Sequence, residues 1–423
     1  MRKDLTPSDL VSRPMAETSR SEESQLHPDI ALLTAGKDKP YALGLSAALI
    51  EKRIPFEVLG SNFVDGPMLH NNPLVTYRNL RGDQAEHAPL PEKILRIFRY
   101  YAKLIAYAMK ARPRVFHILW NNKFEWFDRT ILLLFYRMCG RKIVYTAHNV
   151  NIGERDGTDS FMNRLTLRIQ YRLVDDVFVH TNLMKESLQE KFQIPAEKIH
   201  VIPFPINNTV SDTSLDTAMA RERLGLRPDE RVLLAYGAIA PYKGLEYLVE
   251  ALTFLPKDGV QYRVIIAGAP KKGADEYWRK VQQAVSQSGL DSIVLARIEY
   301  IPDEETEVYF KAADALVLSY THIFQSGVLF LAYNFGLPVL AADVGAFKES
   351  VVESQTGFIF RPKDARDLAR VIQRFFESDL YRDLPVRRKE IRAFAAENYS
   401  WNSAASHILH VYSRLLGTRL QQL

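Results

Sequence analysis

The stretch 312–360 limits most what this chain can fold into, because it alternates short apolar runs with glycine turns. Residues 315–318 (Ala-Leu-Val-Leu) and 338–341 (Pro-Val-Leu-Ala) are apolar runs of the kind that a parallel sheet buries on both faces. Between them, residues 328–335 have the length and the Leu/Ala/Phe spacing of a packed helix. The pattern predicts two buried parallel strands joined by a helix.

Small residues stand at the start of that helix. Ser326 and Gly327 directly precede it, so its first backbone N–H groups lie beside a residue without a side chain. Such an arrangement suits an anion, typically phosphate. Two further glycine turns, at Gly345 and Gly357, come later in the same stretch. Ligands of open α/β sheets bind at the carboxyl ends of the strands, where these residues are expected to gather.

The bulk composition sets the number of domains and the class of protein. A chain of 423 residues exceeds one ordinary core, which predicts two domains. With 47% apolar and 25% charged residues the composition is that of a globular protein. A single cysteine, Cys139, excludes an internal disulfide and a multi-cysteine metal site, and favours a reducing, cytoplasmic location. No apolar run reaches the roughly 18 residues of a membrane span.

The order of the remaining elements places the domain boundaries. Residues 1–27 are polar, rich in Ser and Glu, and predict a disordered tail rather than a secretory signal. From residue 30, strand, glycine turn, helix and strand follow one another, which indicates a parallel sheet. The segment 205–229 is polar and turn-rich, and strand patterns restart at residue 231. We therefore expect domains at 28–205 and 206–398, followed by a terminal helix within 399–423.

Positive charge is concentrated between residues 91 and 142. Twelve Lys or Arg face three acids there, a net charge of +9, so that the rest of the +5 chain carries −4. Apolar residues from Ile94 to Ala108 fall on one predicted helix face, and Lys, Arg, Tyr100 and Tyr107 fall on another. The face that joins Tyr to cations favours an anionic membrane surface contacted by Lys93–Lys142, with a solvated helix as the alternative. No recognised nucleic-acid motif accompanies the charge, so a nucleic-acid partner is not expected.

His148 follows the predicted strand 142–147 directly. At the carboxyl end of a parallel strand, the imidazole points into the crevice where chemistry would occur. It could equally cap a turn or satisfy a neighbouring backbone group. Position alone leaves both readings open.

With strand–glycine turns in both halves, the chain resembles glycosyltransferases of the two-Rossmann (GT-B) fold, most of all the retaining group 1 or family 4. The resemblance spans residues 30–416. It is carried by Gly237-x-x-x-Pro-Tyr-Lys-Gly, by Gly336-x-Pro-Val with Gly345-x-x-x-Glu and Gly357, by His148, and by the Ser400-Trp401 helix start. It implies an α/β fold of two Rossmann-like domains with parallel sheets facing across a cleft, and a terminal helix that crosses back to the first domain.

The resemblance also implies roles for individual residues. Lys243 is expected to contact the donor pyrophosphate, although a lone Lys can also be a solvated loop tip, and His148 to stabilise charge beside the transferring sugar. Glu349 contacts donor ribose or sugar, or else caps a helix. The expected catalytic residues are His148 and Lys243; the expected donor-binding residues are Gly237, Lys243, Arg297, Tyr300, Ser326, Gly327, Val328 and Glu349; the expected acceptor-side residues are Gly36 and Lys37.

Two departures from the family pattern stand out. The pair of Glu residues eight positions apart around the sugar-binding helix is replaced by Ile323 and Leu331. The Arg that often precedes the lysine is missing, and Ala238 and Ala240 fill the available positions. A subset of similar sequences carries Ser-Gly-Val in place of the Glu pair, and Gln325-Ser-Gly-Val fits that subset.

The expected activity is transfer of a sugar from a nucleoside diphosphate sugar to a lipid-linked or polysaccharide acceptor, with retention. We expect no cofactor and no essential metal, and a peripheral position at the inner face of the cytoplasmic membrane. The alternative is a non-catalytic relative that binds nucleotide or glycan and scaffolds a transferase, as the missing Glu pair suggests. A nucleotide-sugar epimerase on the same fold has no supporting feature.

Overall fold

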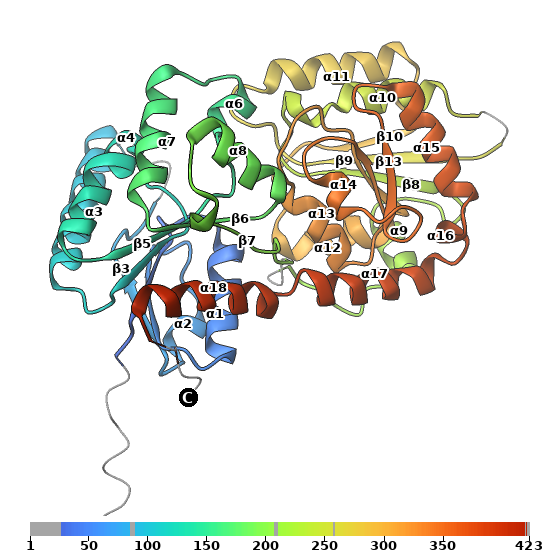
Figure 1. Ribbon diagram of the computed structural model, residues 1–423. Coiled ribbons are helices and arrows are strands. Elements are labelled where there is room, and N and C mark those ends of the chain that lie inside the picture. The colour runs from blue at the N-terminus through green and yellow to red at the C-terminus, as the bar shows by residue number, and fades with distance from the viewer. Residues whose placement is uncertain (1–26, 85–88, 207–209, 257–258, 419, 421–423) are drawn as a thin grey trace, which may run out of the picture.

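The structure is a computed structural model that describes residues 27–84, 89–206, 210–256, 259–418 and 420. The predicted disordered tail, residues 1–27, lies outside the described residues except for His27. The described chain forms two α/β units, each built around one parallel sheet (Figure 1). The expected α/β architecture of two parallel sheets is thereby confirmed.

The first sheet has the strand order β3-β2-β1-β4-β5-β6-β7. Its strands are β1 (Ile30–Leu33), β2 (Phe56–Gly60), β3 (Val75–Asn79), β4 (Val115–Ile118), β5 (Lys142–Thr146), β6 (Asp176–Val179) and β7 (Ile199–Val201), all parallel to their neighbours. The central strands are buried along both faces, as their continuous apolar sequences require. The edge strand β3 is half exposed.

The second sheet has the order β10-β9-β8-β11-β12-β13. Its strands are β8 (Arg231–Tyr236), β9 (Tyr262–Ala267), β10 (Val294–Arg297), β11 (Ala315–Leu318), β12 (Val339–Ala342) and β13 (Gly357–Phe360), again all parallel. The order reverses between β8 and β11 here and between β1 and β4 in the first sheet. The carboxyl ends of these four strands are therefore the expected ligand positions.

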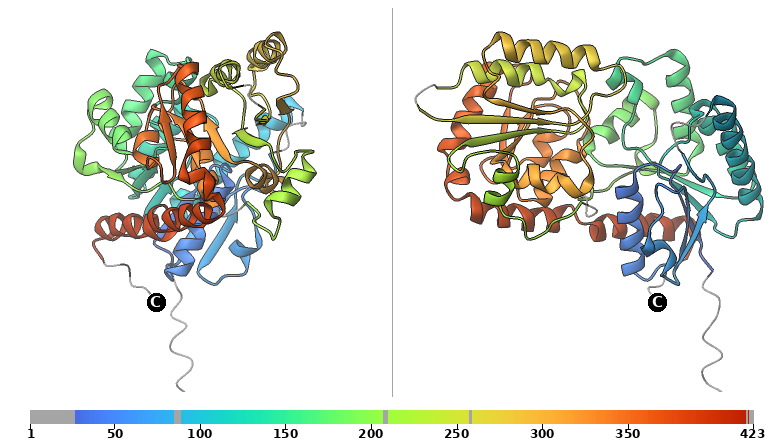
Figure 2. Two further views of the ribbon diagram at one scale, coloured as in Figure 1. Left: turned by 90° about the vertical axis from the view of Figure 1, so that its right-hand side faces the viewer. Right: turned by 180° about the vertical axis from the view of Figure 1, so that it is seen from behind.

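Helices cover both faces of each sheet (Figures 1 and 2). Those of the first unit are α1 (Lys39–Glu51), α2 (Pro67–His70), α3 (Leu90–Lys110), α4 (Glu125–Phe127), the π-helix η1 (Asp128–Leu132), α5 (Leu133–Met138), α6 (Ile152–Asp156), α7 (Phe161–Leu173), α8 (Asn182–Phe192) and η2 (Ala196–Lys198). Those that follow are α9 (Thr217–Arg223), η3 (Pro241–Lys243), α10 (Leu245–Thr253), α11 (Asp275–Gln287), α12 (Asp303–Ala312), α13 (Gly327–Asn334), α14 (Phe347–Ser350), α15 (Ala365–Glu377), α16 (Asp379–Arg382), α17 (Leu384–Asn398) and α18 (Trp401–Leu416).

A buried ion pair ties together the elements that carry the second sheet. Nη2 of Arg221 on α9 donates to Oδ1 of Asp314 over 2.9 Å, just before β11. The other carboxylate oxygen of Asp314 accepts from the backbone N–H of Val232 on β8 over 2.8 Å. Further hydrogen bonds from Arg221 reach three backbone carbonyls, so both charges are satisfied and the start of β11 is fixed beside β8.

The orientation expected for α3 is wrong for both tyrosines and for two apolar residues, whereas Ala108, at the end of the predicted apolar face, is buried as expected. Tyr100 is buried and donates to Asn122 over 2.6 Å, and Tyr107 turns inward to Glu57 over 2.9 Å. Ile94 and Phe98 instead face solvent. The reason is that a phenol can bury its ring and still find a hydrogen-bond partner, so Tyr counts as a core residue here.

The last two helices run beneath both units, α17 under the second and α18 under the first (Figures 1 and 2). Trp401, the first residue of α18, packs against α1 at Gly44, and its Nε1 donates to the carbonyl of Ile206 over 3.0 Å. Further along α18, the Tyr412 hydroxyl lies 2.5 Å from Nδ1 of the buried His117 on β4. The helix that continues the second unit thus contributes to the core of the first.

Gly44 sits inside a helix only because the Trp401 ring needs its space. An added Cβ would lie 2.1 Å from the indole. In an unobstructed helix Gly→Ala stabilises by about 1 kcal/mol; here we expect Gly44→Ala to destabilise by about 1–3 kcal/mol through the clash, measured as a lower urea-unfolding midpoint. The double variant Gly44→Ala/Trp401→Ala should lose less than the sum of the two single variants. An increase in stability for Gly44→Ala would contradict the packing.

Candidate active site between the two units

Two loops converge at the carboxyl ends of β8 and β11. The turn after β8 begins with Gly237 and leads through η3, and the loop after β11 leads into α13. Gly237 has φ +93°, and a Cβ there would lie 3.4 Å from both Lys243 Nζ and Val328 Cγ2. The structure therefore brings Gly237, Lys243 and Val328, three predicted donor-binding residues, to one point.

Lys243 is buried without an opposite charge. Its Nζ donates to the carbonyl of Tyr236 over 3.0 Å and to the hydroxyl of Tyr320 over 2.5 Å, and the side chain is 6% exposed. Among the described residues no carboxylate lies within ion-pair distance of it. Burial lowers the pKa of Lys243 to about 8, because only neutral acceptors compensate the lost hydration. A site of this kind stabilises an anionic ligand.

Tyr320 connects the lysine to the start of α13. Its hydroxyl lies 3.3 Å from Oγ of Ser326, which precedes the helix and is itself buried. The N–H groups of Gly327 and Val328 belong to the first turn of α13 and have no partner within the helix. No role was predicted for Tyr320, although its position two residues after the apolar run 315–318 was a usable signal.

These residues line a pocket of about 400 Å³, here named the cleft pocket, which both units form. Asp38, Tyr41 and Trp401 come from the side of the first unit, and Lys243, Ser326 and the start of α13 from the second. Because its walls belong to two separate sheets, the volume of the pocket depends on how closely the units approach.

The positions of the missing Glu pair face this cleft pocket. Ile323 and Leu331 are buried and line it. Gln325 lines it as well, and among the described residues nothing bonds its buried Oε1. A buried oxygen without a donor is costly, so Oε1 of Gln325 is free to accept a hydrogen bond in this pocket. Sequence reasoning assigned it no role.

His148 lies beside the cleft pocket rather than in its lining. The imidazole stacks on Trp120 at 4.2 Å between ring centroids and meets Tyr41 edge-on at 4.6 Å. Tyr41 lines the cleft pocket and contacts the imidazole. Burial and the neighbouring His180 hold the pKa of His148 well below its usual range, so the ring is neutral at pH 7.

The predicted acceptor-side residues Gly36 and Lys37 lie in the turn between β1 and α1. The carbonyl of Gly36 accepts from Gln84 Nε2 over 3.0 Å, and Lys37 Nζ donates to the carbonyl of Asn121 over 3.2 Å. Burial, followed by repulsion from Arg81, lowers the pKa of Lys37. This turn leads directly to Asp38 in the cleft pocket.

Three predicted donor-binding residues are not brought to the cleft pocket. Arg297 and Tyr300 are exposed at and after the end of the edge strand β10, with Tyr300 76% exposed. Glu349 is exposed on α14. None of the three lines the pocket of Lys243. Their assignment to the donor remains a prediction.

The described ranges contain no group of three or more His, Cys, Asp or Glu placed to hold a metal ion. The expectation that no metal is needed remains a prediction.

Comparison with known families decides what kind of protein this is. Residues 40–209 match the model of Glycosyltransferase Family 4, and residues 216–393 match that of Glycosyl transferases group 1. The chain is a glycosyltransferase of the group 1 and family 4 type. The expected family and enzyme class are confirmed, and the two models meet near the polar segment between the sheets.

Curated relatives of this glycosyltransferase include D-inositol 3-phosphate glycosyltransferases. That of Nocardia farcinica is 29% identical over 65% of this chain and 61% of its own length. That of Streptomyces scabiei is 28% identical over 57% of this chain and 54% of its own. The chain thus spans little more than half the length of these relatives.

Solved structures share the fold of the enzyme. Anabaena HepE in complex with UDP and glucose superimposes with a TM-score of 0.69 at 20% identity, over 92% of this chain and 100% of that one. Sucrose-phosphate synthase from Thermosynechococcus elongatus superimposes with a TM-score of 0.72 at 20% identity, over 92% of this chain and 99% of that one. The expected GT-B arrangement is confirmed.

The buried charge of Lys243 should cost the folded enzyme stability. We expect Lys243→Met to raise the free energy of unfolding at pH 7 by on the order of 1–3 kcal/mol, because the folded state no longer desolvates an ammonium. Lys389→Met, at an exposed position on α17, is the matched control and should change little.

The pH dependence has a defined sign. The pKa of Lys243 is about 8 in the folded state and the ordinary pKa of a lysine, which the unfolded chain retains, is 10.5, so between these two pH values the unfolded chain holds the extra proton. The free energy of unfolding of wild type should therefore rise between about pH 8 and pH 10.5 relative to that of Lys243→Met. The difference in free energy of unfolding between the two proteins should narrow over this range. Urea unfolding of both proteins across this range checks it; a constant gap would contradict the shifted pKa.

Proposed function

We propose that the enzyme transfers a sugar from a nucleoside diphosphate sugar to a membrane-associated glycolipid or polysaccharide acceptor, with retention of configuration. The observation that carries the proposal is the buried, uncompensated ammonium of Lys243 beside the start of α13, in a pocket between two Rossmann-like units. Structural neighbours solved with UDP and glucose, and with UDP-glucose, support the donor class.

The donor diphosphate is proposed to supply the missing negative charge. Lys243 would neutralise the charge that develops on the leaving diphosphate, and the N–H groups of Gly327 and Val328 would donate to its oxygens. Gln325 would accept from a sugar hydroxyl where relatives place a carboxylate. Catalysis then rests on positioning and charge stabilisation, and the neutral ring of His148 contributes polarity rather than a charge.

The acceptor is proposed to come from a membrane surface bound by α3. Leu90, Ile94, Phe98 and Met109 form one apolar stripe along the outer side of this helix, with Phe98 65% exposed. Exposed Arg99, Lys103 and Lys110 lie beside it. Apolar residues flanked by cations suit insertion at the headgroup boundary of an anionic bilayer. No helix in the described part of the chain is long and apolar enough to cross a membrane, and we propose peripheral binding at the inner face.

Nucleotide sugars and a membrane extract test the proposal. We expect transfer, or slow donor hydrolysis, with one donor of a UDP-, GDP- and ADP-sugar panel. Lys243→Ala should lower kcat/KM by about a hundredfold to a thousandfold, because one preorganised donor to the leaving group is lost. Lys389→Ala should be unchanged. If the protein shows no transfer, no donor hydrolysis and no nucleotide binding, the proposed enzyme activity is refuted. If Lys243→Ala fully restores a strain that lacks the wild-type protein, a non-catalytic scaffold is favoured instead.

Flotation with vesicles tests the membrane surface. Wild type should float with phosphatidylcholine vesicles that contain phosphatidylglycerol, and Phe98→Ser with Met109→Ser should reduce the bound fraction about tenfold or more, because two inserted apolar side chains are lost. Val386→Ser on α17, 58% exposed like Met109, is the matched control and should float like wild type. Equal flotation of all three proteins would exclude α3 as the contact.

A further inference from the structure

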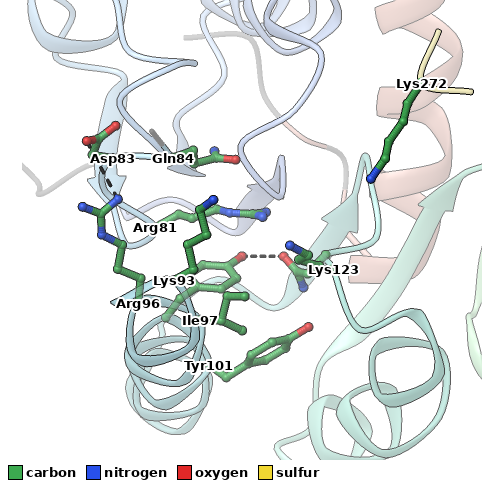
Figure 3. Close-up of a pocket in the computed structure, with 11 residues that line it drawn as sticks. Arg81, Asp83, Gln84, Lys93, Arg96, Ile97, Tyr101, Lys123 and Lys272 are labelled. Atoms are coloured by element: carbon green, nitrogen blue, oxygen red, sulfur yellow. Dashed lines mark hydrogen bonds and ion pairs between the residues drawn. The ribbon is translucent and has the colours of Figure 1, made fainter. Parts of the chain in front are cut away.

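A second pocket, of about 550 Å³, is lined by Arg81 and Gln84, which bond the backbone of Ala35 and Gly36 just before Asp38 of the cleft pocket. The wall of this second pocket carries five cations from four separate segments and one described acid, Asp83; we name it the basic pocket. The cations are Arg81 after β3, Lys93 and Arg96 on α3, Lys123 after β4, and Lys272 before α11. Lys272 belongs to the second unit and reaches toward the others from the opposite side (Figure 3).

Buried hydrogen bonds hold the floor of the basic pocket in place. The Tyr100 hydroxyl donates to Asn122 Oδ1 over 2.6 Å, and Asn122 Nδ2 donates to Asp128 Oδ1 over 3.1 Å. The Arg81 guanidinium lies 5.4 Å from the centroid of the Tyr100 ring and donates to the carbonyl of Ala35. A guanidinium clamped in this way loses little further freedom when it binds a ligand.

Two of the five cations that line the basic pocket have no carboxylate partner in the described part of the chain. Arg96 pairs with Glu92 and lies 4.0 Å from Asp83. In the described ranges no carboxylate forms an ion pair with Lys123 or Lys272. Two guanidinium forks and several ammonium groups around an open pocket match a phosphate dianion, which accepts several charge-assisted hydrogen bonds at once.

The two pockets share their loops. Gln84 of the basic pocket bonds the carbonyl of Gly36, and Asp38, two residues on, lines the cleft pocket. In the second unit the N–H of Lys271 donates to the carbonyl of Ile239 over 2.9 Å. The neighbours Lys272 and Ala238 then face the basic pocket and the cleft pocket respectively. The two pockets are therefore linked through the same loops of both units.

We propose that the basic pocket binds a phosphate group of the acceptor, and so selects phosphorylated acceptors for transfer. The inference rests on the proposed function, since it assigns the second substrate of the same reaction. The phosphate sits among Arg81, Arg96, Lys123 and Lys272 while an acceptor hydroxyl extends past Asp38 into the cleft pocket. Because Lys272 is on the second unit, the bound phosphate draws the two units together.

Calorimetric titration of the full chain tests this, with the donor pocket saturated by the nucleoside diphosphate that binds best. Glucose 6-phosphate is the soluble probe and glucose its neutral counterpart. We expect only the phosphorylated probe to bind, more weakly at high salt. Lys123→Glu and Lys272→Glu, both at exposed positions that tolerate substitution, should each weaken it about tenfold through loss of a charge-assisted contact. Lys389→Glu, the same change on α17, should have no effect.

Vesicles distinguish the source of the phosphate. Phosphatidic acid presents a terminal phosphate, and phosphatidylglycerol presents charge without one. If wild type prefers phosphatidic acid and both Lys123→Glu and Lys272→Glu abolish this preference, the phosphate belongs to a lipid acceptor. If wild type binds glucose 6-phosphate but does not prefer phosphatidic acid, the acceptor is a soluble phosphorylated molecule. The inference is overturned if wild type and both variants bind glucose 6-phosphate and phosphatidic acid with identical affinities. It is also overturned if wild type binds nucleotide but neither glucose 6-phosphate nor phosphatidic acid.

Donor hydrolysis separates this inference from the proposed function. In the absence of acceptor, wild type should hydrolyse the donor slowly, because the donor occupies the cleft pocket alone. Normal donor hydrolysis by wild type, together with unchanged binding of glucose 6-phosphate in Lys123→Glu and Lys272→Glu, refutes the acceptor assignment alone. If wild type neither binds nucleotide nor hydrolyses the donor, the proposed function is refuted. Binding of glucose 6-phosphate would then show a phosphate site that is independent of that function.

Discussion

The ammonium of Lys243 is held out of water with only neutral oxygens around it, and the surrounding structure is arranged about that constraint. Gly237 leaves the space that the side chain needs, Tyr236 and Tyr320 accept its hydrogen bonds, and the first turn of α13 adds unpaired N–H groups a short distance away. Desolvating a cation without a counter-ion costs several kcal/mol unless a ligand restores the balance. Binding of the diphosphate that we propose for the cleft would therefore stabilise this corner of the second unit. The Arg221–Asp314 pair, satisfied on every side, shows the contrasting case of a buried charge whose role is structural.

The apolar replacement of the family's Glu pair changes how the cleft pocket can recognise a sugar. Ile323 and Leu331 remove two negative charges from the neighbourhood of Lys243, and they also remove two acceptors for sugar hydroxyls. Gln325 provides one neutral acceptor in their place, with its Oε1 buried and unpaired among the described residues. A pocket with fewer anionic groups repels a diphosphate less, while its discrimination among hydroxyl patterns depends on fewer hydrogen bonds. The loss of the carboxylates is therefore compatible with donor binding and shifts recognition toward shape.

Local patterns predicted the sheets well, because each central strand is a continuous apolar run whose burial on both faces follows from parallel pairing. The edge strand β3 was missed, since its polar, half-exposed residues look like a loop. The structure brings Gly237, Lys243, Ser326 and Val328 together, and the family resemblance could point to them because short motifs at strand ends carry them. Arg297, Tyr300 and Glu349 also follow strands, but adjacency to a strand end does not say which side chains reach the cleft pocket. The inward turn of Tyr100 depends on Asn122, 22 residues away, and the basic pocket joins Arg81 to Lys272 across two units. Contacts between residues so far apart in the chain leave no local signature.

The two places where the chain passes between the units are bonded to each other. Ile206 lies in the connection from the first unit to the second, and its N–H donates to the carbonyl of Tyr399 over 2.9 Å. In the connection back to the first unit, Trp401 Nε1 donates to the carbonyl of Ile206. Paired connections of this kind act as a single hinge, about which rigid bodies rotate in one plane rather than tumble independently. Since Trp401 also lines the cleft pocket, these two connections lie beside that pocket. Any rotation about them would move the far rims of the pocket more than the residues around Trp401.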